Sequence, residues 1–258
     1  MKVKRNFLNI FIAFSIILIS SIFILACKNN KEIELTPTNF SESSLYSQIK
    51  KAFKDKNYED LIPKAEIYLK YFPYSTNAQD IFYMLATAYK SFVFGPEYDP
   101  HFANKLYDLS KKYLLLYPNG KYKKEFISFK SYAKDIIFKY KYILVKEEIK
   151  RENYWAALDR LHDLCKDKNY KEYLDKNKES IISLFNNLKP KALSQIKEMI
   201  KFRKDKIKEL KNKKEEEKNL KKKNIYENIY ENWILLYKDE IKYLQEKYNE
   251  VKNLSCSL

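Results

Sequence analysis

Glycine is almost absent from this chain, which has two glycines among its 258 residues. Tight turns between β-strands and loops that wrap phosphate groups both depend on glycine, because glycine adopts the required backbone angles freely. Two glycines cannot supply a dinucleotide-binding motif or a series of β-hairpins. Helices need few glycines, and hydrophobic residues make up 45% of the chain, enough to form a buried core. The sequence therefore predicts an all-α fold.

The numbers of metal-binding and nucleophilic side chains are small. Two histidines and three scattered cysteines are too few for a typical zinc site, so we expect no metal site and no catalytic centre. The formal charge of +16 often indicates a nucleic acid or an anionic membrane as partner. However, lysine, asparagine, isoleucine, phenylalanine and tyrosine are abundant while alanine and proline are scarce, as an AT-rich coding sequence would produce. Composition bias therefore explains the charge at least as well.

The first 26 residues have the layout of a secretory signal peptide. A basic start is followed by an apolar run over residues 7–26, which ends in the small residue Ala26 directly before Cys27. A lipoprotein signal peptidase expects a cysteine at this position, because the lipid is attached through a thioether. We predict that residues 1–26 are removed, that Cys27 carries a covalent lipid as the only attached group, and that residues 27–43 form a tether. An uncleaved membrane anchor is the alternative, since 20 apolar residues can span a bilayer.

A lipidated Cys27 places the protein outside the cytosol, anchored to a membrane. We therefore expect no nucleic-acid partner. The two other cysteines match no redox or metal motif, and Cys165 lies on an apolar stripe. A buried free thiol is the expected state of Cys165. A disulfide between Cys165 and Cys256 is the alternative.

An apolar pattern with helical spacing recurs three times and ends twice at a proline. The members of each stripe lie three or four residues apart, so they share one helix face. The stripes are Leu61, Ala65, Tyr68 and Phe72 before Pro73; Leu106, Ser110, Tyr113 and Tyr117 before Pro118; and Ala157, Leu161 and Leu164. Each stripe predicts the second helix of a helical hairpin.

The clearest first helix of a hairpin carries Phe82, Leu85, Ala86 and Tyr89, which resembles the first-helix pattern of tetratricopeptide (TPR) repeats. The small residue lets the two helices of a hairpin approach closely. The spacing between repeats is irregular, because residues 94–100 form a loop and the third hairpin begins with a long helix, roughly Lys121 to Arg151. Residues 44–172 are thus predicted to form a TPR-like α-solenoid of helical hairpins.

Stacked hairpins create a surface lined by their first helices. Aligning the three first helices gives a ladder of tyrosines beside lysines, residue types that are favoured in interfaces with peptides. The residues of this predicted groove are Tyr46, Lys50, Phe53, Tyr83, Thr87, Lys90, Tyr142, Lys146 and Ile149. A solvated helix face in a chain rich in tyrosine and lysine is the alternative interpretation.

The stretch from Tyr46 to Lys171 resembles the BamD/ComL family of outer-membrane assembly lipoproteins. The features that carry the resemblance are the lipidated cysteine with its short linker, Lys56–Leu61 leading to Tyr71–Ser75 and Met84–Tyr89, Leu116–Tyr122, and Lys150–Arg160 after an extended helix. The resemblance implies an outer-membrane location facing the periplasm. It also implies, as partners, a β-barrel assembly protein and other envelope proteins.

The resemblance ends near residue 172, and residues 173–258 are predicted to be a helical extension that is first charged and then amphipathic. A helix over residues 178–188 is expected to end before Pro190. Residues 201–223 carry 12 basic and 5 acidic side chains, typical of a solvated helix or a flexible linker. The final stripe should pack on a partner or back on the body, and it consists of Ile225, Ile229, Trp233, Leu236, Ile241, Leu244, Tyr248 and Val251.

Three hypotheses for the function follow. The first is a membrane-anchored scaffold that helps to assemble and insert β-barrel proteins into the outer membrane by protein–protein binding. The second is a TPR lipoprotein that binds peptidoglycan or factors of cell-envelope organisation and division. The third is an enzyme, which we disfavour: Glu147 and Glu148 are adjacent on a helix and point to different faces, and the sequence places neither His101 nor His162 beside them.

Overall fold

The structure is a computed structural model that describes residues 41–219 and 227–256. Within these ranges it consists of α-helices, one short 3-10 helix and connecting turns, without a strand, which confirms the all-α prediction. The chain divides into two units, Met1–Ser47 and Gln48–Leu258, and each is described by itself. In the first unit, residues 41–47 begin helix α2 (Glu42–Lys54). The predicted signal peptide, Cys27 and the tether up to residue 40 lie outside the described residues.

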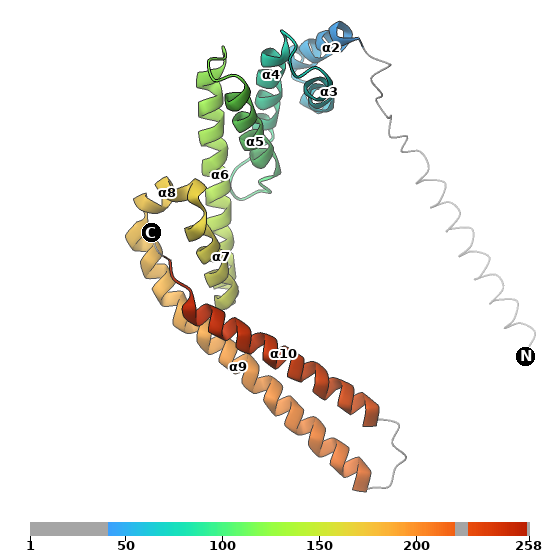
Figure 1. Cartoon of the computed structure of the whole chain (residues 1–258), viewed down its shortest axis with the longest axis vertical. Coiled ribbons are helices and arrows are strands. Elements are labelled where there is room, and N and C mark those ends of the chain that lie inside the picture. Colours follow the sequence, from blue (N-terminus) through green and yellow to red (C-terminus); the bar gives the residue numbers. More distant parts are fainter. Residues whose placement is uncertain (1–40, 220–226, 257–258) are drawn as a thin grey trace, which may run out of the picture. The chain divides into compact units, whose positions relative to one another are not determined.

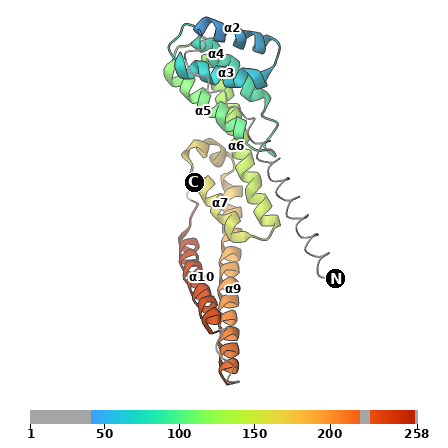
Figure 2. The ribbon, with the colours of Figure 1, turned by 90° about the vertical axis from the view of Figure 1, so that its right-hand side faces the viewer.

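Consecutive helices of the second unit pack against each other as in a TPR-like solenoid (Figures 1 and 2). In chain order, α3 packs on α4, α4 on α5, α5 on α6 and α6 on α7, and then α9 packs on α7 and α10. The elements are α3 (Tyr58–Tyr71), α4 (Ala78–Ser91), α5 (His101–Leu116), α6 (Lys123–Lys150), α7 (Tyr154–Lys166), η3 (Lys168–Tyr170), α8 (Lys171–Lys176), α9 (Lys178–Asn219) and α10 (Glu227–Asn253). The predicted division at residue 172 stays a prediction; α8 runs across it.

The ends of α3 follow from its sequence. The Asn57 side chain accepts a hydrogen bond from the Asp60 backbone N–H at 3.3 Å and so caps the first turn. The helix ends at Tyr71, two residues before Pro73, as predicted. Leu61, Ala65 and Tyr68 are fully buried, which confirms these three members of the predicted stripe, while the fourth, Phe72, follows the helix and is half-buried.

The predicted stripe of α4 is buried as well, and so are three of the four predicted stripe residues of α5, while Tyr117 follows the helix and is half-buried. All four residues of the TPR-like pattern on α4 lie in the core, and Ala86 and Ala88 have no exposed surface, so neighbouring helices approach α4 closely. On α5, Leu106, Ser110 and Tyr113 are buried, and the Ser110 hydroxyl donates to the Leu106 carbonyl of its own helix at 2.6 Å. This bond satisfies the hydroxyl group without a partner from another helix.

The turn between α5 and α6 is fixed by the buried Tyr113 hydroxyl and the half-buried Gln79 amide. The Tyr113 hydroxyl donates to Gln79 Oε1 at 2.9 Å and accepts from the Tyr122 backbone N–H at 3.0 Å. A Cβ atom on Gly120 would lie within 2.8 Å of both Tyr113 and Gln79, so the position requires glycine. The long α6 then spans 28 residues, close to the predicted range of Lys121 to Arg151.

The expected helix end before Pro190 is wrong. Helix α9 runs through Pro190 without interruption for 42 residues. A proline in a helix interior costs about 3 kcal/mol through one lost hydrogen bond and a steric clash. Its neighbours Leu188 and Ala192 are buried in the core with Phe185 and Ile196, and burial of these side chains outweighs that cost. Pro190 itself is exposed.

The apolar stripe predicted for the last helix is correct in its C-terminal half only. Leu244 and Val251 are buried as expected, and α10 packs back on α9. In the other half, Ile229, Trp233 and Leu236 are nearly half exposed, and Ile234 is buried instead. The position of α9 selects which face of α10 is covered, and the spacing in the sequence did not reveal it. Ile225 lies outside the described residues.

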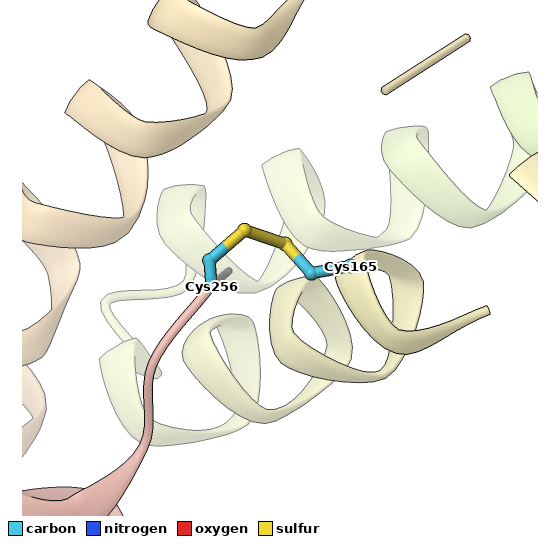
Figure 3. Close-up of a disulfide and its surroundings, with 2 residues drawn as sticks. All are labelled: Cys165 and Cys256. Carbon is cyan, nitrogen blue, oxygen red and sulfur yellow. A yellow bond between two sulfur atoms is a disulfide. The ribbon is translucent and has the colours of Figure 1, made fainter. Parts of the chain in front are cut away.

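The prediction of a free thiol at Cys165 is wrong. Cys165 on α7 forms a disulfide with Cys256, and the two Cα atoms are 5.7 Å apart (Figure 3). The two cysteines are 91 residues apart in the sequence. They meet because α9 and α10 are antiparallel, so the chain returns to α7 after α10. The Lys189 ammonium group donates to the Leu254 carbonyl at 2.8 Å and holds the segment before Cys256. None of the described helices is long and apolar enough to cross a membrane.

Candidate binding surfaces

The predicted groove residues lie in three regions. One is around the first half of α6, one is the second half of α6, and one is the part of α2 that belongs to the first unit. Phe53, Tyr83 and Lys90 come together around the first half of α6, as described below. Lys50 is exposed one turn before Phe53 on α2, and Thr87 is half-buried one turn after Tyr83 on α4. Tyr46 belongs to the first unit, where it is half-buried on α2.

An aromatic cluster joins α2, α4 and α6. The Tyr83 ring stacks on Tyr122 with centroids 4.5 Å apart, and it lies 6.2 Å from Phe129 and 6.5 Å from Phe53. The Lys90 ammonium group lies 5.5 Å from the centre of the Phe129 ring, a cation–π distance. We call Phe53, Tyr83, Lys90, Tyr122 and Phe129 the aromatic face. Its side chains contact each other, so they form a rigid surface.

A half-buried carboxylate supports the aromatic face. Asp80 accepts hydrogen bonds from the Tyr122 hydroxyl and the Lys121 ammonium group, each at 2.5 Å. Burial alone would raise the pKa of Asp80, but these hydrogen bonds and the positive charges of Lys121 and Lys50 lower it. Burial and the bond to Asp80 raise the pKa of Tyr122. At neutral pH the carboxylate is therefore charged, and it fixes the Tyr122 ring under Tyr83.

Tyr142, Lys146 and Ile149 lie further along α6. Tyr142 follows Phe129 by 13 residues, or about 20 Å at the helical rise. The Lys146 ammonium group lies 4.9 Å from the Tyr142 ring centre. Tyr142 and Ile149 pack against the core that α7 and α9 form. These three residues lie apart from the aromatic face along α6, and the role of the nine predicted residues in binding stays a prediction.

A hollow lies between α3 and α5, the second helices of the first two hairpins. It has a volume of about 520 Å³, and its floor includes Leu85 of α4, which is almost fully buried. We call this hollow the α3–α5 groove. Its lining residues are Glu66, Leu69, Lys70, Pro73, Tyr74, Leu85, Tyr89, Leu109, Lys112 and Leu116.

The α3–α5 groove is apolar inside and carries charged groups at its border. Glu66 accepts hydrogen bonds from the Tyr89 hydroxyl and from Lys105, the latter at 2.9 Å. Burial and the bond to Glu66 raise the pKa of Tyr89 strongly, so the hydroxyl keeps its proton at physiological pH. Lys70 and Lys112 add positive charge from α3 and α5. Such a groove suits an extended apolar segment with a negative group.

Sequence reasoning missed this groove because it assigned the apolar residues of the second helices to the core. One signal was present in the sequence. Tyr74 and Leu116 line the groove and lie outside the buried stripes, and they are 90% and 39% exposed. Large apolar residues that do not belong to the buried stripe of a helix can mark a binding surface when they lie close together.

The candidate acid–base residues are engaged in structural contacts. Glu147 pairs with Lys150 at 2.6 Å, and Glu148 pairs with Arg160 at 3.4 Å. His101 begins α5 and packs edge-on against Phe102, while His162 is buried beside Phe185. Within residues 41–219 and 227–256, no group of three or more histidine, cysteine, aspartate or glutamate side chains could hold a metal ion.

The fold defines the class of an all-α protein whose consecutive helices pack as in a TPR-like solenoid. A family model described as YfiO, outer membrane lipoprotein, matches residues 30–200. The match covers most of the chain, which therefore belongs to this family of outer membrane lipoproteins. No curated protein matches the chain.

Proposed function

We propose that this protein is a membrane-anchored scaffold lipoprotein that acts in the assembly and insertion of β-barrel proteins into the bacterial outer membrane, by protein–protein binding. The membership in the outer membrane lipoprotein family carries the proposal. The matched residues 30–200 include the helices α2 to α7 that build the aromatic face and the α3–α5 groove.

Two features of the chain support a location outside the cytosol. The first is the signal sequence that ends before Cys27, whose lipid would anchor the protein at the outer membrane, facing the periplasm. The second is the Cys165–Cys256 disulfide, because disulfides persist in oxidising compartments and are rare in the cytosol. The second feature is independent of the family match.

The proposed mechanism is binding by preformed surfaces. Packed helical hairpins hold the α3–α5 groove in one shape, so a partner loses little free energy in ordering it. The groove would take an extended apolar segment of the β-barrel assembly protein or of another envelope protein, and Lys70 and Lys112 would attract a negative group beside that segment. The groove predicted from Tyr46 to Ile149 is the second candidate surface. The scaffold role requires no reactive centre.

Crosslinking in living cells tests the function. The full protein with an affinity tag at its C-terminus is crosslinked, purified under denaturing conditions and analysed by mass spectrometry. We expect the β-barrel assembly protein as the main product. Products limited to peptidoglycan enzymes or division factors would contradict the proposal and favour the second hypothesis. An unrelated lipoprotein with the same tag controls for chance encounters at the membrane.

A further inference from the structure

A further hollow is formed by the end of α7, the short elements η3 and α8, and the C-terminal segment after α10. Its volume is about 440 Å³. Pockets that bind small molecules have volumes of roughly 300–1,000 Å³. We call it the α7–α8 hollow. Its lining residues are His162, Cys165, Lys166, Asp167, Lys168, Lys171, Leu174, Asp175 and Ser255.

The wall that the C-terminal segment contributes is held in place by two bonds. The disulfide joins Cys165 at the end of α7 to Cys256, the neighbour of Ser255 (Figure 3). On the other side of Ser255, the Leu254 carbonyl accepts a hydrogen bond from the Lys189 ammonium group at 2.8 Å. Ser255 is therefore fixed from both sides. A ligand that enters a preformed hollow of this kind loses little free energy in ordering it.

Three lysines give the α7–α8 hollow a positive lining. Lys166 comes from the last turn of α7, Lys168 from η3 and Lys171 from the first turn of α8. All three side chains are exposed. Within the part of the chain that the structure describes, none of the three ammonium groups is paired with a carboxylate. Their charges are therefore available to a ligand.

Two carboxylates also line the hollow, and one of them is already compensated. Asp167 Oδ2 pairs with Lys141 of α6 at 3.4 Å, and Asp167 Oδ1 accepts from the backbone N–H and the side-chain amide of Asn169 at 3.0 and 2.9 Å. Lys141 is not a lining residue. Asp175 is exposed one turn after Lys171 on α8, and it pairs with no lysine in the described residues. Three lysines thus stand against one uncompensated carboxylate, and the lining is positive overall.

His162 adds unused hydrogen-bonding capacity to the inner wall. It is 6% exposed and packs beside Phe185, and neither of its ring nitrogens has a hydrogen-bond partner among residues 41–219 and 227–256. Buried polar groups without a partner are rare in proteins. The terminal torsion of a histidine side chain rotates over a broad range, so the ring can turn to offer a nitrogen to a ligand oxygen in the hollow.

These features favour a small ligand with a doubly charged anionic group. A phosphate monoester carries about 1.5 to 2 negative charges at pH 7. The compact ammonium group of lysine binds phosphate as a point charge. We propose that the α7–α8 hollow binds a phosphate monoester group, which Lys166, Lys168 and Lys171 hold while Leu174 contacts the carbon skeleton. This site is separate from the α3–α5 groove, so it does not depend on the β-barrel assembly role.

Two phosphate esters test the proposal and distinguish a soluble ligand from a lipid headgroup. The full protein, purified in detergent, is titrated by calorimetry with glycerol 3-phosphate and with dihexanoyl phosphatidic acid. Glycerate, a carboxylate of similar size, is the control, and we expect glycerol 3-phosphate to bind about tenfold more tightly because of its higher charge. Tighter binding of the phosphatidic acid would assign the hollow to a lipid headgroup, and equal or weaker binding to a soluble ester. No saturable binding of either ester, or equal binding of glycerate, would overturn the proposal.

A pair of double variants locates the site. Lys168→Gln with Lys171→Gln removes two lysines of the hollow, and we expect about tenfold weaker binding of glycerol 3-phosphate. Lys139→Gln with Lys176→Gln removes the same charge outside the hollow and should leave the affinity unchanged. This comparison excludes unspecific attraction by the formal charge of +16. Circular dichroism checks that each variant is folded. Equal losses of affinity in the two variants would contradict the proposed site.

The two histidines of the chain report where the ligand binds. His162 lines the hollow, while His101 begins α5 and is the internal control. The protein is labelled with ¹⁵N-histidine and purified through a tag without histidine, and His101→Gln assigns the signals. We expect glycerol 3-phosphate to shift the ring signals of His162 and to leave those of His101 in place. Shifts of both histidines, or of neither, would overturn the proposal.

Discussion

Single polar groups decide how the hairpin of α4 and α5 is joined to α6. The Tyr113 hydroxyl, the Gln79 amide and the Asp80 carboxylate connect α4 to the turn before α6, and the Tyr113 ring stacks on Phe126 with centroids 3.9 Å apart. The sequence predicted that Tyr113 is buried, from its place in the stripe. It did not predict the hydrogen bonds, because these join residues 34 to 42 positions apart.

Asp80 should make stability depend on pH. Its pKa is lowered in the folded protein, so its stabilising effect is complete above the unfolded pKa near 4 and is lost as pH falls through the folded value. Asp80→Asn should therefore lower the free energy of unfolding by about 1–2 kcal/mol at pH 7. The loss should be smaller at pH 3. Urea unfolding at the two pH values measures it.

The control is Asp60→Asn, which removes a more exposed carboxylate paired with Lys64 at 2.7 Å. Exposed ion pairs contribute at most about 1 kcal/mol, so this variant should change little at either pH. If Asp80→Asn and Asp60→Asn lose the same free energy at pH 7 and at pH 3, the hydrogen bonds to Asp80 do not stabilise the fold as the structure suggests.

The lysines at the α3–α5 groove should control partner binding. Lys70→Glu combined with Lys112→Glu reverses two charges at its border, and we expect about tenfold weaker capture of the β-barrel assembly protein in a pull-down. Lys50→Glu combined with Lys146→Glu makes the same charge change in the groove predicted from the sequence and is the matched comparison. A loss in the second variant alone would place the binding site in that predicted groove.

The hairpin turns repeat one backbone feature that the helix pattern does not show. Lys56 and Glu152 have positive φ angles of 54° and 58°, and each is followed by an Asn–Tyr pair that begins the second helix of a hairpin. A left-handed conformation is unfavourable for residues other than glycine, by roughly 1 kcal/mol. The repeated sequence was visible, but the conformation follows from how the second helix folds back.

Glycine at either position should stabilise the protein. Lys56→Gly and Glu152→Gly relieve the unfavourable conformation, and we expect each to raise the free energy of unfolding by about 0.5 kcal/mol after the entropy cost of glycine. Thermal unfolding of each variant and of the double variant measures the effect. As a control, Lys54→Gly at the end of α2 should be destabilising, because this residue is helical. Destabilisation by all three glycines would contradict the assigned turn conformation.

Burial, rather than local sequence, decided the course of the last two helices. Pro190 predicted a helix end, yet Leu188 and Ala192 on either side of it are packed into the core, and the helix continues. On α10 the local stripe predicted burial of Trp233, but α9 packs against Ile234 instead. Neither outcome is encoded by spacing along one helix, since each depends on where a second helix lies.

The disulfide ties the C-terminal hairpin to the body. Replacing both cysteines, Cys165→Ser with Cys256→Ser, should lower the free energy of unfolding by about 2–4 kcal/mol, because the crosslink restricts a long stretch of the unfolded chain. Urea unfolding with and without dithiothreitol measures the loss. The reductant should bring the wild type to the level of the variant and leave the variant unchanged. Insensitivity of the wild type to the reductant would show that the thiols are free.

Cys27 should control the location of the whole protein. Cys27→Ala removes the sulfur that the lipid requires, so we expect an unprocessed precursor that no longer fractionates with the outer membrane. Membrane fractionation and immunoblotting measure size and location. Replacement of a neighbouring residue, Asn29→Ala, serves as the control and should leave processing intact. Mature Cys27→Ala protein in the outer membrane fraction would contradict lipid anchoring.

The sequence alone determined the helical class, most of the buried stripe residues of α3, α4, α5 and α7, and the approximate range of the long helix α6. These properties follow from the residues of one helix and its caps, so they are local. Tertiary structure decided the disulfide, the continuous α9, the exposed face of α10 and the α3–α5 groove. Each of these depends on side chains that lie far apart in the chain and meet only when helices pack, and burial then outweighs the local preferences.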